Sequence, residues 1–182
     1  MNFVALPRIP SALLARLTRV RLFLCDVDGV LTDGSVFMGG STELKQFDIQ
    51  DGLGMVTLRR AGIPVGWISS RPSPATTRRA KDLEIDFLAQ SKTGKVPAIE
   101  KILARAGLTW AETAYAGDDI VDLAVLKRVG LACAVANAVP EVKRAAQYVT
   151  VRPGGHGAVR ELAELILKAQ GKWDRVIADY SA

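Results

Sequence analysis

The chain lacks the cysteine content of a disulfide-stabilised extracellular protein. It holds two cysteines, Cys25 and Cys133, and both lie in apolar, strand-like runs. A cysteine in such a run is usually a small core residue. The sequence therefore predicts no disulfide framework, and we expect a reducing, cytoplasmic location.

Long apolar runs and basic-aromatic patches are also missing. No stretch approaches the roughly 20 apolar residues that a helix needs to cross a bilayer. Pro7, Arg8 and Pro10 interrupt the first residues, which argues against a signal peptide. The formal net charge is +5, but lysines and arginines do not alternate with aromatic residues, which make up 6% of the chain. We therefore expect neither a membrane nor a nucleic-acid partner.

Apolar runs alternate with helix-like segments over the 182 residues, of which 49% are hydrophobic. This order predicts an α/β, doubly wound (Rossmann-like) parallel sheet in a single domain over residues 1–182. A β-hairpin flap over residues 34–47, with a glycine turn at 39–40, would replace a cap domain. The tail, residues 171–182, would be extra helix or frayed chain. The expected strands are 22–25, 63–68, 85–89, 114–116, 131–136 and 148–150, and the expected helices are 11–19, 52–61, 72–83, 96–106, 120–128, one from Pro140, and 158–170.

Two carboxylates, Asp26 and Asp28, follow the first buried run directly. Ligands of open α/β sheets bind at the carboxyl ends of the strands, so we expect both side chains at the ligand crevice. Two close anions favour a cation between them, and Mg²⁺ prefers carboxylate oxygens. An ordinary Asp-Gly turn is the alternative interpretation. A calcium loop is excluded, because Val30, Leu31 and Phe37 occupy positions that need a ligand, a glycine and a glutamate.

The segment containing Asp26, Asp28 and Thr32 resembles the first motif of the haloacid dehalogenase superfamily, Asp-x-Asp-x-x-x-Thr. The resemblance implies that Asp26 attacks phosphorus to form an aspartyl-phosphate. It also implies that Asp28 protonates the leaving oxygen and later activates water.

Three further positions match the later motifs of that superfamily: Ser69 as a phosphate donor, Lys95 as the neutralising cation, and Asp118 as a metal ligand. Taken singly, each could be a cap or a surface residue. One site explains them all, and the resemblance assigns Mg²⁺ to Asp26, the backbone carbonyl of Asp28, and Asp118. Asp119 would orient the site or act through water, and the part of Asp122 stays open.

From about Val20 to Lys172 the chain is similar to the capless subfamily that includes phosphatases of 3-deoxy-D-manno-octulosonate (KDO) 8-phosphate. The resemblance rests on residues 26–34, 44–47, 51–54, 117–119 and 154–161. It implies a homotetramer in which hairpins form a central barrel and a neighbour covers each active site. A short hairpin cannot close a site alone, so an open site with a bulky substrate is the other interpretation.

The resemblance implies a sugar acid phosphate as substrate, contacted by Thr32, Arg71 and Arg79, because guanidinium pairs well with carboxylate. A solvated helix face is the alternative for the two arginines. Ser70, Gln50 and His156 depart from the subfamily, which commonly has Gly, Arg and Arg there. A nine-carbon acid, KDN 9-phosphate, is therefore the alternative substrate. A non-catalytic oligomerisation module and a nucleic-acid phosphatase are weaker alternatives.

Overall fold

The computed structural model describes residues 9–39, 42–92 and 94–181, and its centre is a six-stranded sheet. The strand order is β5-β4-β1-β6-β7-β8, and every neighbouring pair is parallel. The predicted doubly wound α/β fold is thus confirmed. The strands are β1 (Leu22–Cys25), β4 (Val65–Ser69), β5 (Phe87–Gln90), β6 (Thr113–Gly117), β7 (Leu131–Ala134) and β8 (Tyr148–Val149).

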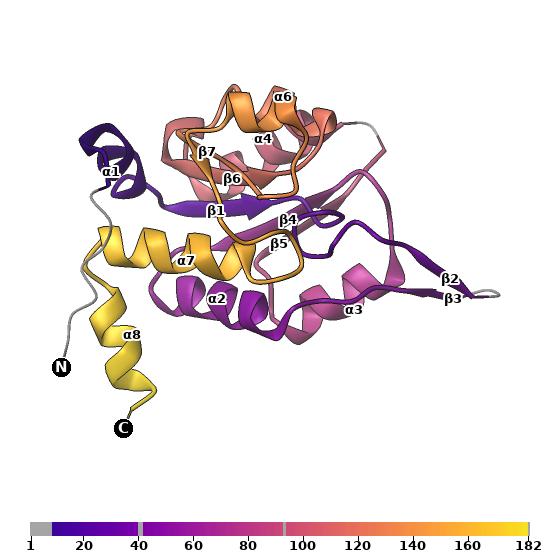
Figure 1. Cartoon of the computed structure of the whole chain (residues 1–182), viewed down its shortest axis with the longest axis horizontal. Helices are drawn as coiled ribbons and strands as arrows, with labels where there is room; N and C mark the ends of the chain where they lie inside the picture. Colours follow the sequence, from indigo (N-terminus) through magenta and orange to yellow (C-terminus); the bar gives the residue numbers. More distant parts are fainter. Residues whose placement is uncertain (1–8, 40–41, 93, 182) are drawn as a thin grey trace.

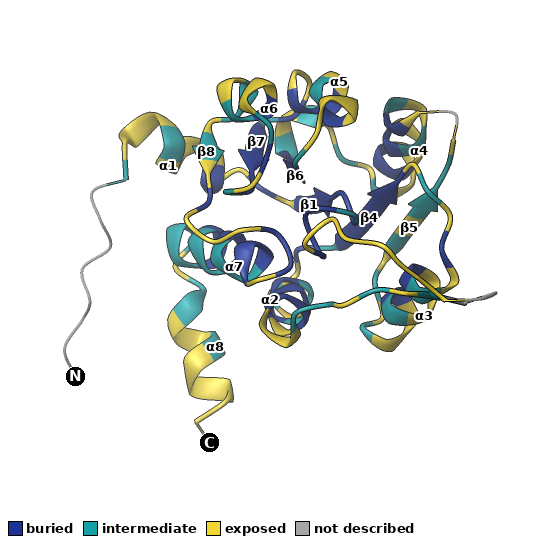
Figure 2. Cartoon of the chain, turned by 45° about the vertical axis from the view of Figure 1, so that its right-hand side comes forward, coloured by how far each residue is buried: buried dark blue, intermediate teal, exposed yellow. Residues whose placement is uncertain are grey.

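Helices cover both faces of this sheet (Figure 1). α2 (Ile49–Arg60), α3 (Pro74–Asp82) and α7 (Ala158–Ala169) lie on one side, and α4 (Lys95–Ala106) and α6 (Pro140–Ala145) lie on the other. Because both faces are covered, β1, β4, β6 and β7 are buried throughout, as Figure 2 shows for the centre of the molecule. The remaining helices are α1 (Ser11–Leu17), the 3₁₀ helices η1 (Trp110–Glu112) and η2 (Ile120–Asp122), α5 (Leu123–Leu126) and α8 (Trp173–Asp179).

Several helix boundaries differ from those predicted. α2 begins at Ile49, earlier than expected, because the Asp48 carboxylate accepts hydrogen bonds from the first backbone N–H groups. The prediction of one helix over 120–128 is wrong, since Asp119 caps the short helix η2 and α5 ends at Leu126. The tail contains α8, and every helix in the described part of the chain is too short or too polar to span a bilayer.

The predicted hairpin is present as β2 (Phe37–Gly39) and β3 (Thr42–Leu44), which pair antiparallel and separately from the main sheet. It projects from the body of the molecule (Figure 1), and Phe37, Met38 and Leu44 are exposed on it. Its predicted glycine turn includes Gly40, which lies outside the described residues. No cap domain is present among the described residues between β1 and α2, as predicted.

The strand order reverses beside β1. From β1 the chain winds outward through β4 to β5, then returns to β6 on the other side of β1. Cys25 at the end of β1 lies opposite Trp67 of β4 and Ala116 of β6. The loops that follow β1 and β6 therefore meet at the switch point, where sheets of this kind bind ligands.

Candidate active site

Asp26, the first residue after β1, lies beside a lysine that belongs to helix α4. Its Oδ2 lies 2.8 Å from Nζ of Lys95, and its Oδ1 accepts the N–H of Val27 at 2.6 Å. Lys95 was expected just before a helix and is instead the first residue of α4, which points its side chain inward to an exposure of 3%. The structure thus brings together two residues that the sequence predicted for one site.

Burial raises the pKa of Asp26 to about 6, although Lys95 acts in the opposite direction. Burial alone would lower the pKa of Lys95, but Asp26 and Asp122 outweigh it and raise that pKa. The lysine is therefore held as a cation beside a carboxylate that is largely ionised at neutral pH.

Asp118 and Asp122 complete a cluster with Asp26. One carboxylate oxygen from each of the three lies within 4.8 Å of the others. Asp118 follows β6, and its Oδ1 is buried without a hydrogen-bond partner among the described residues. Burial, with the charges of Asp26 and Asp122, raises the pKa of Asp118 to about 7. An anion crowded by anions and left with an unpartnered oxygen fits a site for a hard cation.

Asp122, whose part the sequence left open, is fully engaged by protein groups. Its Oδ1 lies 2.6 Å from both Nζ of Lys95 and the hydroxyl of Tyr115, which donates to it. Its Oδ2 accepts the N–H of Asp118 at 3.0 Å and that of Asp119 at 3.4 Å. With both oxygens occupied, Asp122 orients Lys95 and the loop of Asp118. Sequence reasoning did not single out Tyr115, because a tyrosine within a strand resembles an ordinary core residue.

Two glycines allow these loops to approach each other. A Cβ on Gly29, where φ is +90°, would lie 2.0 Å from Oδ2 of Asp118. A Cβ on Gly117 would lie 2.6 Å from Cγ of Asp122. Neither position has space for a larger residue, so the glycines of the two motifs are needed to bring the carboxylates together.

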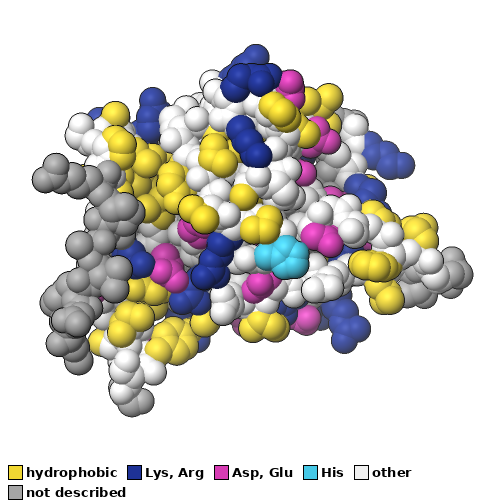
Figure 3. Space-filling model, viewed as in Figure 1, with side chains coloured by type: hydrophobic (Ala, Val, Ile, Leu, Met, Phe, Trp, Pro, Cys, Tyr) yellow, Lys and Arg dark blue, Asp and Glu magenta, His cyan; other side chains and the backbone are white. Residues whose placement is uncertain are grey.

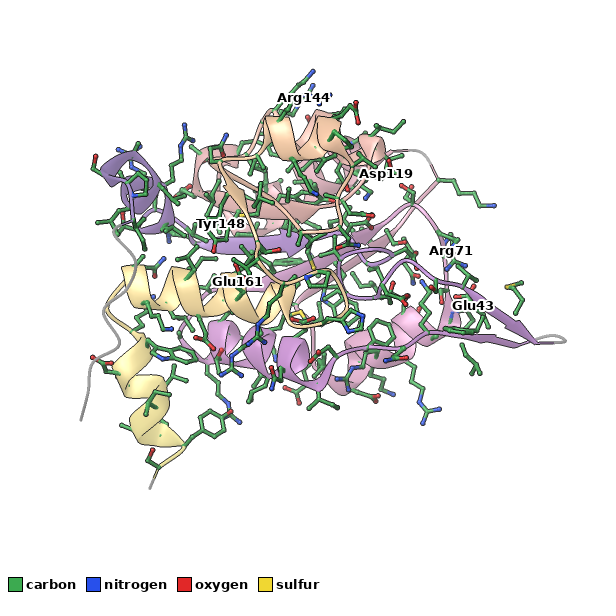
Figure 4. All side chains as sticks on the ribbon, viewed as in Figure 1. Glu43, Arg71, Asp119, Arg144, Tyr148 and Glu161 are labelled. Atoms are coloured by element: carbon green, nitrogen blue, oxygen red, sulfur yellow. The ribbon has the colours of Figure 1, made fainter. Side chains whose placement is uncertain are left out.

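Asp28 is not part of this cluster, and its carboxylate pairs with two cations, of which sequence reasoning had found only Arg71. Its Oδ1 lies 2.7 Å from Nζ of Lys45 and 3.2 Å from Nη2 of Arg71. Arg71 is also paired with Glu43 from β3, and Figure 4 labels both residues at the hairpin end of the sheet. Glu43 accepts a hydrogen bond from the Ser73 hydroxyl at 2.7 Å. The hairpin therefore supplies Lys45 and Glu43 to the site.

Ser69 and Thr32 are both buried and both hold turns. Ser69 is the last residue of β4, and its hydroxyl oxygen lies 3.0 Å from both the backbone N and the backbone O of Arg71. The Thr32 hydroxyl accepts the N–H groups of Gly29 and Gly34, each at 3.2 Å. Their predicted contacts with phosphate or substrate remain predictions.

Arg79 does not join the charged groups around Asp28. Its Nη2 would lie 2.9 Å from a Cβ built on Gly52 of α2, and its buried Nε has no partner among the described residues. Its predicted contact with substrate remains a prediction. Asp119 is exposed and caps η2 by accepting the N–H of Ile120 at 2.7 Å.

Gln50 and His156, two of the three residues that depart from the subfamily, are both exposed. Gln50 accepts a hydrogen bond from Nη1 of Arg152 at 3.1 Å. A guanidinium therefore lies beside position 50, where the subfamily commonly has Arg, although it comes from another part of the chain. His156, the single histidine, is exposed on the face shown in Figure 3.

Comparisons with known proteins identify the family. The family model described as haloacid dehalogenase-like hydrolase matches residues 60–162. The chain is 39% identical over 167 residues to the 3-deoxy-D-manno-octulosonate 8-phosphate phosphatase of Escherichia coli strain K12, covering 91% of this chain and 89% of that protein.

Solved structures extend the similarity. The phosphatase of the same name from Moraxella catarrhalis, in complex with a magnesium ion, a phosphate ion and a KDO molecule, is 37% identical with a TM-score of 0.89, over 92% of this chain and 97% of that one. The cobalt-bound deoxy-D-mannose-octulosonate 8-phosphate phosphatase of Haemophilus influenzae is 42% identical with a TM-score of 0.84, over 86% and 92% of the two chains. This chain therefore belongs to the haloacid dehalogenase-like hydrolases, among the phosphatases of that family.

Proposed function

We propose that the protein is a Mg²⁺-dependent phosphomonoesterase that forms an aspartyl-phosphate and converts KDO 8-phosphate to KDO and phosphate. One observation carries the proposal: Asp26 pairs with Lys95 and shares a carboxylate cluster with Asp118, while Asp28 pairs with the cations Lys45 and Arg71. That separation gives the two carboxylates different tasks. The similarity to phosphatases of this name from Escherichia coli and Moraxella catarrhalis supports the substrate.

In the first step an Asp26 oxygen attacks phosphorus, and the bond from phosphorus to the sugar oxygen breaks. Asp28 acts as the general acid that delivers a proton to that leaving oxygen. In the second step Asp28 takes a proton from water, which attacks phosphorus and releases phosphate from Asp26. Lys95, 2.8 Å from Asp26, neutralises charge that develops on the phosphoryl oxygens.

Asp26, Asp118 and the backbone carbonyl of Asp28 would hold Mg²⁺. When bound, the ion supplies positive charge that screens the phosphate from the carboxylates. The unpartnered Oδ1 of Asp118 and its raised pKa support this assignment. Because Asp122 has both oxygens engaged, it would act by orienting Lys95.

Arg71 would bind the carboxylate of the sugar acid. It is the partly exposed guanidinium beside Asp28, with a side-chain exposure of 39%. A planar guanidinium pairs with a carboxylate in bidentate fashion, which gives selectivity for an acidic sugar. In the free protein Arg71 forms an ion pair with Glu43. The carboxylate of a bound substrate would therefore replace Glu43 as the partner of Arg71.

The active site would be covered by a neighbouring subunit in a homotetramer. The exposed apolar residues of the hairpin support this assembly, because side chains such as Met38, 77% exposed, are costly to leave in water. The hairpin itself is too small to close the site.

The test is phosphate release with Mg²⁺ from KDO 8-phosphate, KDN 9-phosphate and glucose 6-phosphate, compared by kcat/KM. We expect KDO 8-phosphate to be preferred, and Asp26→Asn to lower kcat by about a thousandfold or more with assembly unchanged. A preference for KDN 9-phosphate would keep the reaction and replace the substrate. No release from any of the three would overturn the proposal and favour a non-catalytic module.

A further inference from the structure

A glycine-containing segment between β8 and α7 lies directly on the loop that follows the catalytic aspartates. We call residues 152–157 the strap, and residues 29–33 the aspartate loop. The N–H of Gly155 in the strap donates to the carbonyl of Val30 at 3.0 Å. A Cβ on Gly154 would lie only 1.8 Å from the carbonyl oxygen of Gly29. The two backbones therefore touch, and no side chain fits between them.

Asn137, in the turn after β7, links the same two segments. Its Oδ1 accepts the N–H of Gly154 at 2.7 Å, and its Nδ2 donates to the carbonyl of Gly29 at 3.4 Å. One amide side chain thus contacts the strap and the aspartate loop at once. This arrangement transmits a displacement of one segment to the other.

Asp51 of α2 holds the C-terminal end of the strap. Its Oδ2 accepts the N–H of Gly157 at 3.2 Å, and its Oδ1 accepts the N–H of Arg160 at 2.7 Å. Asp51 is only 1% exposed, so it makes these bonds away from water. The carboxylate also lies at the N-terminus of α7, where a negative charge is favourable.

Glu161 holds the other end of the strap. It accepts hydrogen bonds from the N–H groups of Val151 and Arg152, each at 3.0 Å, and from the Tyr148 hydroxyl at 2.7 Å. Figure 4 shows Tyr148 and Glu161 reaching toward each other from β8 and α7. The strap is therefore fastened at both ends, with its glycines against the aspartate loop.

The aspartate loop in turn determines where the catalytic groups lie. Gly29, which the strap covers, follows Asp28 directly and lies under the carboxylate of Asp118, with a built Cβ 2.0 Å from its Oδ2. A shift of this loop moves Asp28 and changes the space beside Asp118. A misplacement of about 1 Å in such a site costs around a hundredfold in rate.

We propose that Asp51 is a positioning residue for catalysis: it holds the strap on the aspartate loop, and the strap keeps Asp28 and Asp118 in register. Asp51 contacts neither Asp28 nor Asp118 in the described structure, so it acts only through the backbone segments between them. Burial raises the pKa of Asp51 to about 6, which shows that the charged form is costly at this position.

The first test measures backbone hydrogen exchange in full-length wild-type protein and in Asp51→Asn. The substitution keeps the shape of the side chain but removes the charge and one acceptor oxygen. We expect faster exchange in peptides covering the strap and also in peptides covering residues 29–33. Glu164→Gln is the matched control, because Glu164 lies on α7 and its ion pairs within the described residues are with Arg160 and Lys168. It should leave both segments unchanged.

The second test is kinetic and rests on the proposed phosphatase activity. Asp51→Asn should lower kcat about tenfold or more with KM for the sugar phosphate within about threefold of wild type. Asn137→Ala, which cuts the link without touching Asp51, should lower kcat similarly. The double variant should lose less than the product of the two single losses, because both act on one unit.

The outcomes separate the two proposals. Faster exchange confined to the strap, with kcat unchanged, would overturn the positioning role and leave Asp51 a structural cap. If wild-type protein releases no phosphate, the proposed function fails, and exchange at residues 29–33 alone decides the inference. Should Asp51→Asn not fold, Asn137→Ala carries both measurements.

Discussion

Lys45 of the hairpin segment forms an ion pair with Asp28, its Nζ lying 2.7 Å from Oδ1, although the lysine side chain has no exposed surface. Nζ also donates to the Thr76 hydroxyl at 3.1 Å. The hairpin segment therefore delivers a buried cation to the residue that we assign as acid and base. The hairpin belongs to the active site as much as to any subunit contact.

Replacing Lys45 should damage catalysis more than its position in a surface hairpin indicates. Lys45→Met removes the cation beside Asp28 and leaves Arg71 as its remaining cationic partner. We expect kcat/KM to fall about 10- to 100-fold, because the variant removes a buried cation that holds the Asp28 carboxylate in place. Steady-state phosphate release measures this, with Lys81→Met at an exposed position of α3 as the control of equal charge change. Equal activity of the two variants would show that the ion pair has no catalytic role.

Arg71 should set the preference for acidic over neutral sugars. Arg71→Lys keeps the charge near Asp28 and Glu43 but loses the planar fork that pairs with a carboxylate. We expect the ratio of kcat/KM for KDO 8-phosphate to that for glucose 6-phosphate to fall by about tenfold or more. A parallel fall for both substrates would instead mean that Arg71 serves the phosphate or Asp28.

The apo protein should lose stability as pH rises across the range in which Asp51 titrates. Its folded pKa is raised from 3.8 to about 6, so between these values the folded state binds more protons than the unfolded state. The free energy of unfolding therefore falls as pH rises, by at most ~3 kcal/mol for a shift of about two pKa units. Urea denaturation in EDTA at pH 4.5 and pH 7 should show a smaller fall in Asp51→Asn than in wild type. An identical fall in both proteins would contradict this account.

Mg²⁺ should stabilise the folded protein, and more strongly at higher pH. Asp26 and Asp118, with pKa values raised to about 6 and about 7, bind protons that the ion must displace. We expect millimolar Mg²⁺ to raise the Tm by several degrees at pH 8 and by little at pH 5.5. EDTA should reverse the effect, and Asp118→Asn should abolish it. A Tm increase that is equal at both pH values would argue against these ligands.

The sequence predicted the part of the site that strand ends supply. Asp26 and Asp118 follow β1 and β6, Ser69 is the last residue of β4, and parallel topology brings such ends together regardless of loop detail. Lys45 and Glu43 could not be placed in this way, because nothing in the periodicity of a hairpin gives its direction relative to the main sheet. Tyr115 was missed for a different reason. Its side chain is fully buried, and a tyrosine within a strand cannot be distinguished from a core residue unless the partner of its hydroxyl is known.

Helix starts were predictable only where local chemistry determined them. Pro140 begins α6 as expected, since proline suits the first helical turn. The segment after Asp118 was misread as one long helix because apolar spacing there continues past Leu126, while Asp119 and Asp122 use their carboxylates on nearby backbone N–H groups. A side chain that serves the active site thus overrode the helical pattern.

The hairpin should hold the assembly together if the proposed homotetramer forms. Phe37, Met38 and Leu44 are 54%, 77% and 64% exposed, which is a large apolar surface for so short an element. Met38→Glu should place a charge in that contact and shift the solution mass from four times the 19.5 kDa chain toward smaller species, measured by light scattering. Ile177→Glu on α8, where Ile177 is 49% exposed, is the matched control and should keep the wild-type mass.

If a neighbour covers the site, Met38→Glu should also raise KM for the sugar phosphate, while circular dichroism should show that the fold persists. A wild-type chain that is monomeric at micromolar concentration would rule out this arrangement and leave an open site that binds its substrate unaided.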